Sequence, residues 1–299
     1  MIIFHFIGKF RLFLLTLFLF FFSHFSILAK EPYKYDVAIC AIFQNEAPYL
    51  REWIEFHKLV GVKHFYLYNN LSNDEYQKVL NPYIRSGEVD LIEWGYNTNP
   101  DGANWSTIQK MAYDHALNLT RNKVKWVAFI DTDEFLFPVQ VDNLANFLQD
   151  YENFAAVCVN WQMYGTSGVK KISKGHLLIE DLIYKAPFDY YENMHVKSIV
   201  RPEFVETNVN PHSFAFQPGF YQVNANKEIF SGSYSAVIID KIRINHYWTR
   251  DEHFFNHIKL ARRQKWQDAG CITRASNINK EVDKAIFKYV PALKKILKK

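Results

Sequence analysis

Strand-like and helix-like segments alternate regularly between Tyr35 and Ile130, and this alternation constrains the fold more than any other feature. Short β-branched and apolar runs are typical of buried strands, whereas apolar residues spaced three or four apart are typical of helices. Repeated strand–helix units predict an α/β fold, in which a mostly parallel sheet is covered by helices on both faces. The predicted strands are 35–43, 63–70, 88–94 and 123–130, and the predicted helices are 46–62, 72–87 and 104–120.

Polar segments follow three of the predicted strands, at 44–46, 69–74 and 131–134. The carboxyl ends of parallel strands meet at one edge of a sheet, and open α/β sheets bind their ligands at that edge. We therefore expect these three segments to converge on one ligand-binding site.

The pattern changes after Pro138, where strands with longer loops replace the strict alternation and predict an α+β half. The chain ends in a lysine-rich segment with apolar residues at helical intervals. A solvated helix that closes the domain is the favoured interpretation, and a basic amphipathic helix on anionic lipid is the alternative. We predict a main domain over 36–250 and a basic helical segment over 251–299.

The first 29 residues resemble a targeting segment rather than part of the fold. Lys9 and Arg11 precede an apolar stretch, and the small residue Ala29 follows it, as in a secretory signal. The stretch also lies near the lower limit for a membrane span, so a signal peptide and an uncleaved signal anchor both fit. Both predict a membrane-anchored or secretory-pathway protein, in the Golgi lumen of a eukaryote or the envelope of a bacterium.

Three carboxylates follow the apolar strand 123–130 within four residues, in the sequence Asp131-Thr132-Asp133-Glu134. Carboxylates this close disfavour joint ionisation unless a cation compensates their charge. Asp131 and Asp133 can both lean toward one ligand, and a divalent ion held by one or two carboxylates suits a substrate diphosphate. The alternative is a helix N-terminus, where acidic residues are favoured without any ligand.

Several motifs in order along the chain resemble glycosyltransferase family 92 and its bacterial relatives in the family 2-like group. The resemblance covers about residues 36–265 and is more specific than a lone DxD motif. It implies a GT-A fold, a nucleotide-sugar donor (often UDP-galactose), Mn²⁺ or Mg²⁺ as cofactor, and transfer with inversion. The motifs are "AIFQNEAPYLREWIEFHKLVGVKHFYLYNNLSND", "WVAFIDTDEFLFP", "WQMYGTSG", "HVKSIVRP" and "INHYW".

The resemblance assigns metal and donor roles to three residues. Asp131 and Asp133 match the metal and nucleotide-sugar motif, with Asp133 expected to contact the metal and Asp131 to lie nearer the ribose or the metal. His246 of "INHYW" matches a C-terminal histidine that serves as a further metal ligand. A hydrogen-bonded core histidine is the alternative for His246.

Polar residues after the first two strands are candidates for donor binding. Asn45 and Glu46 match the family signature and are expected near the base or ribose, although both also suit the start of the following helix. Asn70 and Asp74 follow the second strand, where nucleoside contacts and ordinary turn chemistry are about equally expected.

Two further segments supply donor-binding candidates. Gly165 and Gly168 of "YGTSG" resemble a glycine loop that lets the backbone approach the donor sugar, with a plain hairpin turn as the alternative. Lys197 and Arg201 of "HVKSIVRP" can form charge-assisted hydrogen bonds with diphosphate oxygens. Solvated surface positions are the equally weighted alternative for these two cations.

An inverting transfer needs a carboxylate near the acceptor hydroxyl to take its proton. The resemblance implies an acid after the glycine loop, where "HLLIEDLIY" carries Glu180 and Asp181. We favour Glu180, with Asp181 second, and Asp189 and Glu192 stay open as candidates. A chance acidic pair in a solvated helix is the alternative.

The favoured function is metal-dependent sugar transfer from a nucleotide diphosphate sugar to a glycan, glycolipid or glycoprotein hydroxyl. A metal-dependent phosphohydrolase and a non-catalytic nucleotide- or carbohydrate-binding protein are the rivals. The formal net charge is only +4, which argues against a dedicated nucleic-acid binder because such a protein needs a dense basic surface.

Overall fold

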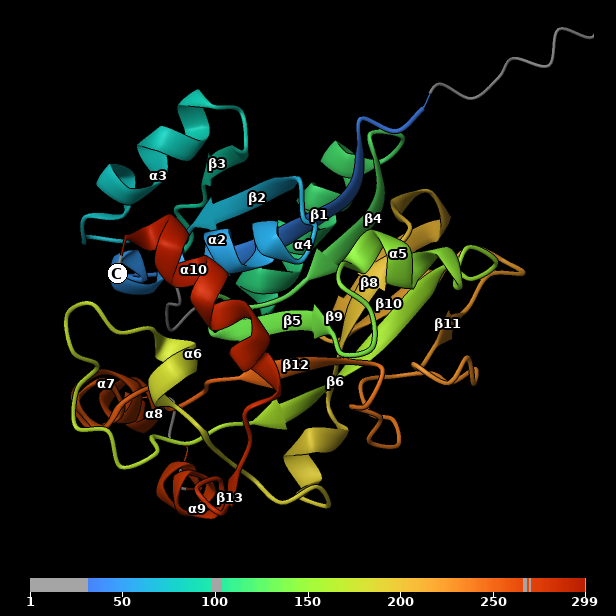
Figure 1. Cartoon of the computed structure of the whole chain (residues 1–299). Helices are drawn as coiled ribbons and strands as arrows, with labels where there is room; N and C mark the ends of the chain where they lie inside the picture. Colours follow the sequence, from blue (N-terminus) through green and yellow to red (C-terminus); the bar gives the residue numbers. More distant parts are fainter. Residues whose placement is uncertain (1–31, 98–103, 266–267, 269, 299) are drawn as a thin grey trace, which may run out of the picture. The chain divides into compact units, whose positions relative to one another are not determined.

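The computed structural model describes residues 32–97, 104–265, 268 and 270–298 (Figure 1). Every helix and strand described below lies within the unit Lys34–Lys299. The predicted signal segment, residues 1–29, lies outside the described residues. Among the residues that are described, no helix is both long and apolar enough to cross a membrane.

A single mixed sheet forms the centre of this unit. Four strands pair in parallel in the order β3-β2-β1-β4, which confirms the predicted alternation. The sheet continues through β8, which is antiparallel to both β4 and β6, and then through β12 and β5. The bounds are β1 (Tyr35–Phe43), β2 (His64–Asn69), β3 (Val89–Glu93), β4 (Val124–Phe129), β5 (Glu134–Pro138), β6 (Ala156–Met163), β8 (Val196–Val200) and β12 (Ile242–His246), with β11 (Gln222–Val223) paired to β6.

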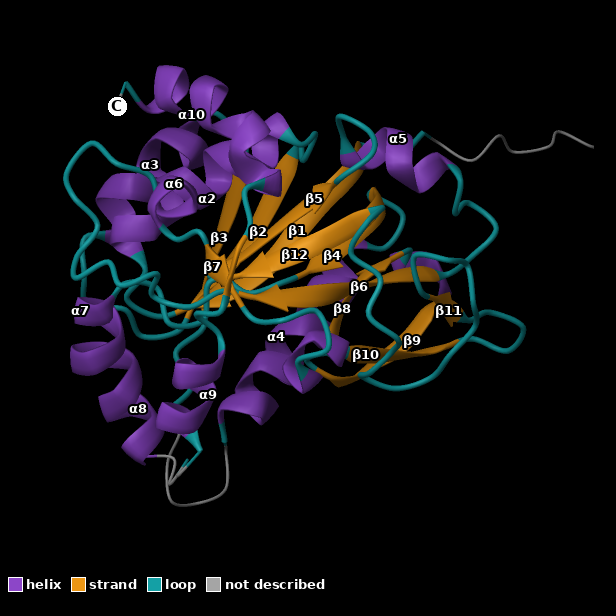
Figure 2. Cartoon of the chain, turned by 60° about the horizontal axis from the view of Figure 1, so that its bottom comes forward, coloured by secondary structure: helices purple, strands orange, loops and turns teal. Residues whose placement is uncertain are grey.

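Helices cover both faces of this sheet, as the sequence predicts. Figure 2 shows α2 (Ala47–Leu59) and α10 (Val290–Leu297) on one side and α4 (Trp105–Thr120) on the other. Alternate residues of β1 point into two separate apolar clusters, Val37 and Ile39 into one and Ala38 and Cys40 into the other. Successive side chains of a strand point to opposite faces, so a strand apolar at every position must be covered on both.

The C-terminal helix α10 packs against α2. Leu293 and Leu297 are buried, and the Tyr289 ring just before α10 lies 5.2 Å from the Phe56 ring of α2. The lysines between these apolar positions are mostly exposed. The helix therefore uses its apolar face to cover α2 rather than a lipid surface.

The remaining elements are mostly short helices and strands. The described chain between β6 and the C-terminus is mixed helix and strand, as the predicted α+β half requires. These elements are α3 (Tyr76–Arg85), α5 (Leu144–Gln149), α6 (Leu178–Asp181), β7 (Tyr184–Lys185), η1 (Tyr191–Met194), η2 (Pro202–Phe204), β9 (Val205–Asn210), β10 (Ser213–Phe216), α7 (Glu252–Phe254), η3 (Phe255–Lys259), α8 (Leu260–Lys265), α9 (Cys271–Asn277), β13 (Glu281–Val282) and η4 (Ala285–Tyr289).

Candidate functional site

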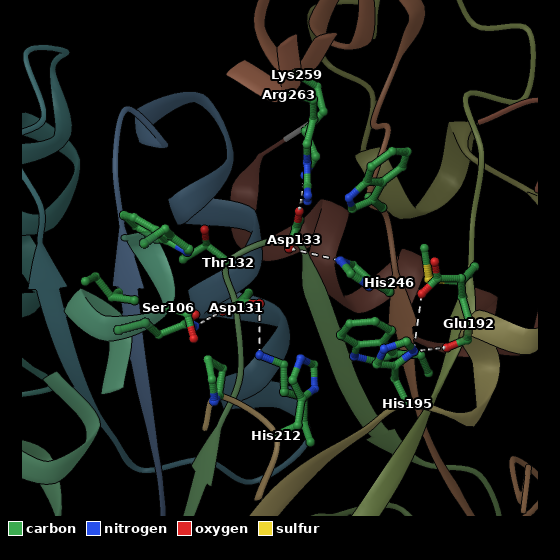
Figure 3. Close-up of a pocket in the computed structure, with 18 of the residues that line it drawn as sticks. Ser106, Asp131, Thr132, Asp133, Glu192, His195, His212, His246, Lys259 and Arg263 are labelled. Carbon is green, nitrogen blue, oxygen red and sulfur yellow. Dashed lines mark hydrogen bonds and ion pairs between the residues drawn. The ribbon is translucent and has the colours of Figure 1, made fainter. Parts of the chain in front are cut away.

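A pocket of about 770 Å³ opens at the carboxyl ends of the central strands (Figure 3). Its walls come from the end of β1, the first turns of α4, the turn after β4, the ends of β6 and β12, and the helices after residue 251. Among the predicted site residues, those that line it are Glu46, Asp131, Asp133, Glu192, Lys197 and His246. The polar segments after β1 and β4 thus converge as predicted.

The turn between β4 and β5 is held by its own last residue. The Glu134 carboxylate accepts a 2.9 Å hydrogen bond from the Asp131 backbone N–H, and the Glu134 N–H donates to the Asp131 carbonyl at 3.1 Å. The Asp133 carbonyl accepts a 2.8 Å bond from the Tyr247 N–H, just past β12. Burial raises the pKa of Glu134 well above its usual range. Glu134 therefore shapes the turn, while Asp131 and Asp133 reach the pocket.

Asp131 is held between two side chains from opposite directions. Gln109 Nε2 donates to Asp131 Oδ1 at 2.6 Å, and Lys197 Nζ donates to Asp131 Oδ2 at 2.9 Å. Lys197 also lies 3.7 Å from the Glu134 carboxylate, and its side chain is only 1% exposed. Lys197 lines the pocket as predicted, but its ammonium is directed at two carboxylates and not at open space.

Asp133 faces two groups from the C-terminal part of the chain. Its Oδ1 lies 3.4 Å from His246 Nε2 at the end of β12, and its Oδ2 lies 3.3 Å from Lys259 Nζ. Burial alone would raise the pKa of the Asp133 carboxyl, but the charges of Lys259 and His246 outweigh burial and hold this pKa well below its usual range. Asp133 is therefore an anion inside a largely buried site.

The Asp133 and His246 side chains fit a shared divalent cation. Two ligand atoms about 2.1 Å from an octahedral ion lie about 3 Å apart along one edge, which is close to the separation of Asp133 Oδ1 and His246 Nε2. Among the described residues, His246 Nδ1 is buried without a hydrogen-bond partner, and its Nε2 is the nitrogen that faces Asp133. Carboxylate oxygen and imidazole nitrogen are both common ligands of Mn²⁺-type ions.

A cationic wall, formed by Lys259, Arg262, Arg263 and Arg274, stands opposite the turn. The Lys259 ammonium lies 5.1 Å from the Trp248 ring centroid, and the Arg263 and Arg274 guanidinium carbons lie 5.4 Å and 5.5 Å from it. The sequence predicts only a basic helical segment over this region. The signal was present, because Lys259, Arg262 and Arg263 are spaced three and four apart and therefore share one helix face.

Glu46 lies in the pocket but forms a buried ion pair with Arg250. The Arg250 guanidinium lies 3.7 Å from the centroid of the Tyr49 ring of α2 and 4.5 Å from that of the Phe254 ring of α7. Burial raises the pKa of Glu46, and the Arg250 charge opposes that shift. The ion pair therefore links the start of α2 to the segment after β12. Glu46 also lines the pocket.

Three predicted donor-binding residues hydrogen-bond to backbone groups and do not line the pocket. The Asn45 side-chain oxygen accepts from the Asn73 N–H at 2.8 Å, and Asp74 accepts from the Ala47 N–H at 2.8 Å. Asn70 donates to two backbone carbonyls, each at 2.8 Å. Asn70 and Asp74 are thus used in turn hydrogen bonds, whereas Asn45, which suited the start of the following helix, accepts a bond from the loop after β2 instead.

The glycine loop lies away from the pocket as well. A Cβ at Gly165 would lie 2.2 Å from the Asn279 side-chain oxygen, so this glycine permits close packing against the chain before β13. Gly168 has φ +70, with open space around it, as in an ordinary turn. Arg201 pairs with Glu203 at 2.7 Å and is also directed away from the site. None of these three residues lines the pocket.

The favoured base is misplaced for its predicted role. Glu180 lies on α6, outside the pocket, and its carboxylate is 2.5 Å from Lys294 of α10. Asp181 pairs with His176 at 2.9 Å, and these three residues form a partly exposed cluster of their own. Asp189 also lies outside the pocket.

Glu192 is the remaining base candidate, and it does line the pocket. Its Oε2 lies 3.2 Å from His195 Nδ1, and its Oε1 lies 3.9 Å from Arg274 Nε. Figure 3 shows Glu192 on the His246 side of the pocket, across from Asp131. The acidic pair in "HLLIEDLIY" gave a stronger local signal than a lone glutamate, although only Glu192 reaches the site.

Comparison with known proteins decides the family. The sequence model of glycosyltransferase family 92 matches residues 33–268. The chain belongs to glycosyltransferase family 92. A family 92 protein from Ricinus communis is 28% identical over 210 residues, covering 68% of this chain and 35% of the relative. The chain thus spans about a third of the length of that relative.

More distant relatives have named activities. A galactan β-1,4-galactosyltransferase from Arabidopsis thaliana is 32% identical over 134 residues, covering 42% of this chain and 26% of the relative. A β-1,4-galactosyltransferase from Caenorhabditis elegans is 29% identical over 120 residues, covering 38% of this chain and 28% of the relative.

Among solved structures, Staphylococcus aureus TarS (residues 1–349) matches with a TM-score of 0.36 and 15% identity, covering 56% of this chain and 48% of that one. The family assignment confirms the resemblance found in the sequence. The mixed, mostly parallel sheet between helices is the α/β, GT-A-type arrangement expected of this glycosyltransferase family.

Proposed function

We propose that this protein transfers a sugar, galactose in the simplest case, from a UDP-sugar to a glycan hydroxyl with the help of a divalent cation. The observation that carries the proposal is the pairing of Asp133 and His246 opposite the cationic wall, in one pocket at the carboxyl edge of the sheet. Carboxylate and imidazole ligands facing a set of cations suit a metal-bound diphosphate. The relatives named as galactosyltransferases support galactose as the sugar.

The strand order indicates where the nucleoside would bind. The order β3-β2-β1-β4 reverses direction between β1 and β4, and doubly wound sheets bind nucleotides at such a switch point. Phe43 and Gln44 at the end of β1 and Gln109 of α4 line that part of the pocket. Asp131, positioned by Gln109 and Lys197, would accept a hydrogen bond from the ribose.

The diphosphate would lie between the β4–β5 turn and the cationic wall. Asp133 and His246 would hold Mn²⁺ or Mg²⁺, which when bound neutralises the charge that develops on the leaving diphosphate. Lys259 and the wall arginines would donate charge-assisted hydrogen bonds to phosphate oxygens. Burial lowers the pKa of Lys259, and Asp133 opposes this shift by favouring the ammonium.

We assign the general base to Glu192 in place of Glu180. The acceptor hydroxyl would attack the anomeric carbon while the Glu192 carboxylate takes its proton, and the bond between that carbon and the diphosphate would break with inversion. His195 and Arg274 flank the two carboxylate oxygens and would hold Glu192 in position. The Glu180 carboxylate, engaged by Lys294 outside the pocket, is unsuited to this role.

The rival functions are less well supported by the site. A phosphohydrolase would need further metal ligands in the pocket, whereas the His176–Glu180–Asp181 cluster lies outside it. A non-catalytic binding protein has no need of Glu192 beside the acceptor side of the pocket. Membrane anchoring through residues 1–29, and with it a Golgi or envelope location, belongs to the same proposal.

Release of UDP from UDP-galactose tests the proposal. The full-length protein should release UDP in the presence of Mn²⁺ and transfer labelled galactose to a β-1,4-galacto-oligosaccharide. A protein that binds UDP-galactose and Mn²⁺ but gives neither UDP nor labelled product would be a binding protein, and the enzymatic proposal would be wrong.

A further inference from the structure

A column of aromatic rings runs from the candidate metal ligand to the mouth of the pocket. The Trp161 ring lies 4.3 Å from the His246 ring on one side and stacks on the His195 ring at 4.8 Å on the other. The Tyr234 ring lies 4.5 Å from the His195 ring and continues the column outward. All four side chains line the pocket.

Tyr234 is exposed but firmly held. Its side chain is 57% exposed, whereas large aromatic side chains usually contribute to folding stability by being buried. The loop that carries it is bonded to both sides of His195, through Val196 N–H to the Ser233 carbonyl at 3.1 Å and Ser235 N–H to the Met194 carbonyl at 3.0 Å. A rigid, exposed aromatic ring at the rim of a pocket is typical of a ligand-binding surface.

The inner end of the column carries a buried polar group without a partner. Trp161 is only 8% exposed, and its indole N–H is buried without a hydrogen-bond partner within the described chain. Leaving a buried donor unpaired costs free energy, so such a group in a pocket wall indicates a missing acceptor atom. A ligand hydroxyl or ring oxygen would supply that acceptor.

Polar, uncharged side chains line the pocket next to Tyr234. Ser233 donates a 3.1 Å hydrogen bond to Asn210, and both line the pocket beside Tyr234. Lys197 is already paired with Asp131 and Glu134, so it offers no free charge for an anionic ligand. Apolar rings next to uncharged hydrogen-bonding groups match the two kinds of surface on a neutral sugar ring.

We infer that Trp161, His195 and Tyr234 form the acceptor subsite, and that the acceptor is a neutral saccharide whose ring stacks on this column. The Glu192 carboxylate, 3.2 Å from the His195 ring nitrogen, would then lie beside the acceptor hydroxyl that it deprotonates. This inference depends on the proposed function, since it names the second substrate of the same site.

Titration calorimetry on the full-length protein can separate the two substrates. UDP with Mn²⁺ is titrated first, and β-1,4-galactobiose, cellobiose and the acidic digalacturonic acid are then titrated into the UDP-saturated protein. Tyr234→Ala should weaken binding of a neutral disaccharide roughly threefold to tenfold while leaving UDP affinity within about twofold. Tyr221→Ala, which removes another exposed tyrosine outside the pocket, should change neither affinity.

Trp161→Phe provides an independent test, because it keeps an aromatic ring but removes the indole N–H together with the five-membered ring that carries it. It should weaken the same disaccharide roughly threefold to tenfold. The inference is overturned if the wild-type protein binds UDP but no neutral disaccharide, if digalacturonic acid binds more tightly, or if Tyr234→Ala weakens UDP as much as the saccharide. A wild-type protein that binds no UDP would instead overturn the proposed function itself.

Discussion

The Lys259 ammonium lies 3.3 Å from the Asp133 carboxylate and thereby joins the turn after β4 to a helical segment 126 residues further along the chain. Lys259 is buried and Asp133 is largely so, with side chains 9% and 15% exposed, and their charges therefore attract each other more strongly than an exposed pair would. The same ammonium belongs to the cationic wall, and it is therefore available to a diphosphate placed next to Asp133.

Replacing Lys259 tests whether the cationic wall binds the donor. Lys259→Met keeps the length of the side chain and removes its charge, so KM for UDP-galactose should rise about 10- to 100-fold through loss of a charge-assisted hydrogen bond. Steady-state kinetics with varied donor measure this change. The exposed Lys170→Met serves as control, and an equal rise in both variants would contradict a specific role for Lys259.

Two glutamates separate the competing assignments of the base. Glu192→Gln should lower kcat by about 10²- to 10⁴-fold, since the amide cannot take a proton from the acceptor. Glu180→Gln should retain kcat, because Glu180 lies outside the pocket and pairs with Lys294. Single-turnover transfer to a saccharide acceptor measures both. A large loss of kcat in Glu180→Gln, with Glu192→Gln active, would restore the assignment first made from the sequence.

The sequence was sufficient to predict those parts of the site that follow directly from a strand. The apolar run 123–130 predicts a buried strand, and Asp131 and Asp133 must then emerge at its carboxyl end. His246 was found through the "INHYW" motif, which ends a second buried strand. At these positions a local pattern determines where the side chain lies, because pairing within the sheet leaves little freedom.

Other site residues could not be predicted because their position depends on how distant segments pack. Glu180 and Glu192 occupy similar polar segments after β6, and only the folded chain shows that Glu192 lines the pocket while Glu180 pairs with Lys294 of α10. Asn70 and Asp74 have residue types suited both to turns and to ligands, and the turn hydrogen bonds account for them. The cationic wall depends on the helices after residue 251 folding back over the β4–β5 turn.

Lys197 holds two carboxylates and should be important for stability. Lys197→Met would leave Asp131 and the buried Glu134 without their cationic partner, so the free energy of unfolding should fall by about 3–5 kcal/mol. Denaturant unfolding measures this change, and the exposed Lys123→Met should stay within about 0.5 kcal/mol of wild type. Equal stability of the two variants would show that the Lys197–Asp131–Glu134 contacts contribute little.

His57 should make stability depend on pH, independently of the pocket. Its Nδ1 contacts the Trp53 carbonyl at 2.8 Å and its Nε2 accepts from the Leu136 N–H at 3.1 Å, which requires the neutral ring. Burial lowers the pKa of His57 from 6.5 to about 3. The unfolded chain therefore binds a proton that the folded protein excludes, and this group lowers the free energy of unfolding by about 1.4 kcal/mol per pH unit as pH falls from 6.5 toward 3.

His57→Gln removes that pH dependence while keeping a polar side chain. The free energy of unfolding of both proteins is measured in urea at pH 7, 5.5 and 4.5. The difference in favour of the wild type should shrink as the pH falls. Parallel stability curves over this range would mean that His57 is protonated in the folded protein and that its assigned tautomer is wrong.

The central claim is that Asp133 and His246 hold a divalent cation needed for sugar transfer. The most direct measurement is the rate of UDP release from UDP-galactose with a galacto-oligosaccharide acceptor, in Mn²⁺ and in EDTA, for wild type and Asp133→Asn. A thermal melt confirms that the variant is folded. We predict that wild-type release stops in EDTA and returns with Mn²⁺, and that Asp133→Asn is inactive in both. Wild-type activity that persists in EDTA, or full activity of Asp133→Asn, would contradict the account.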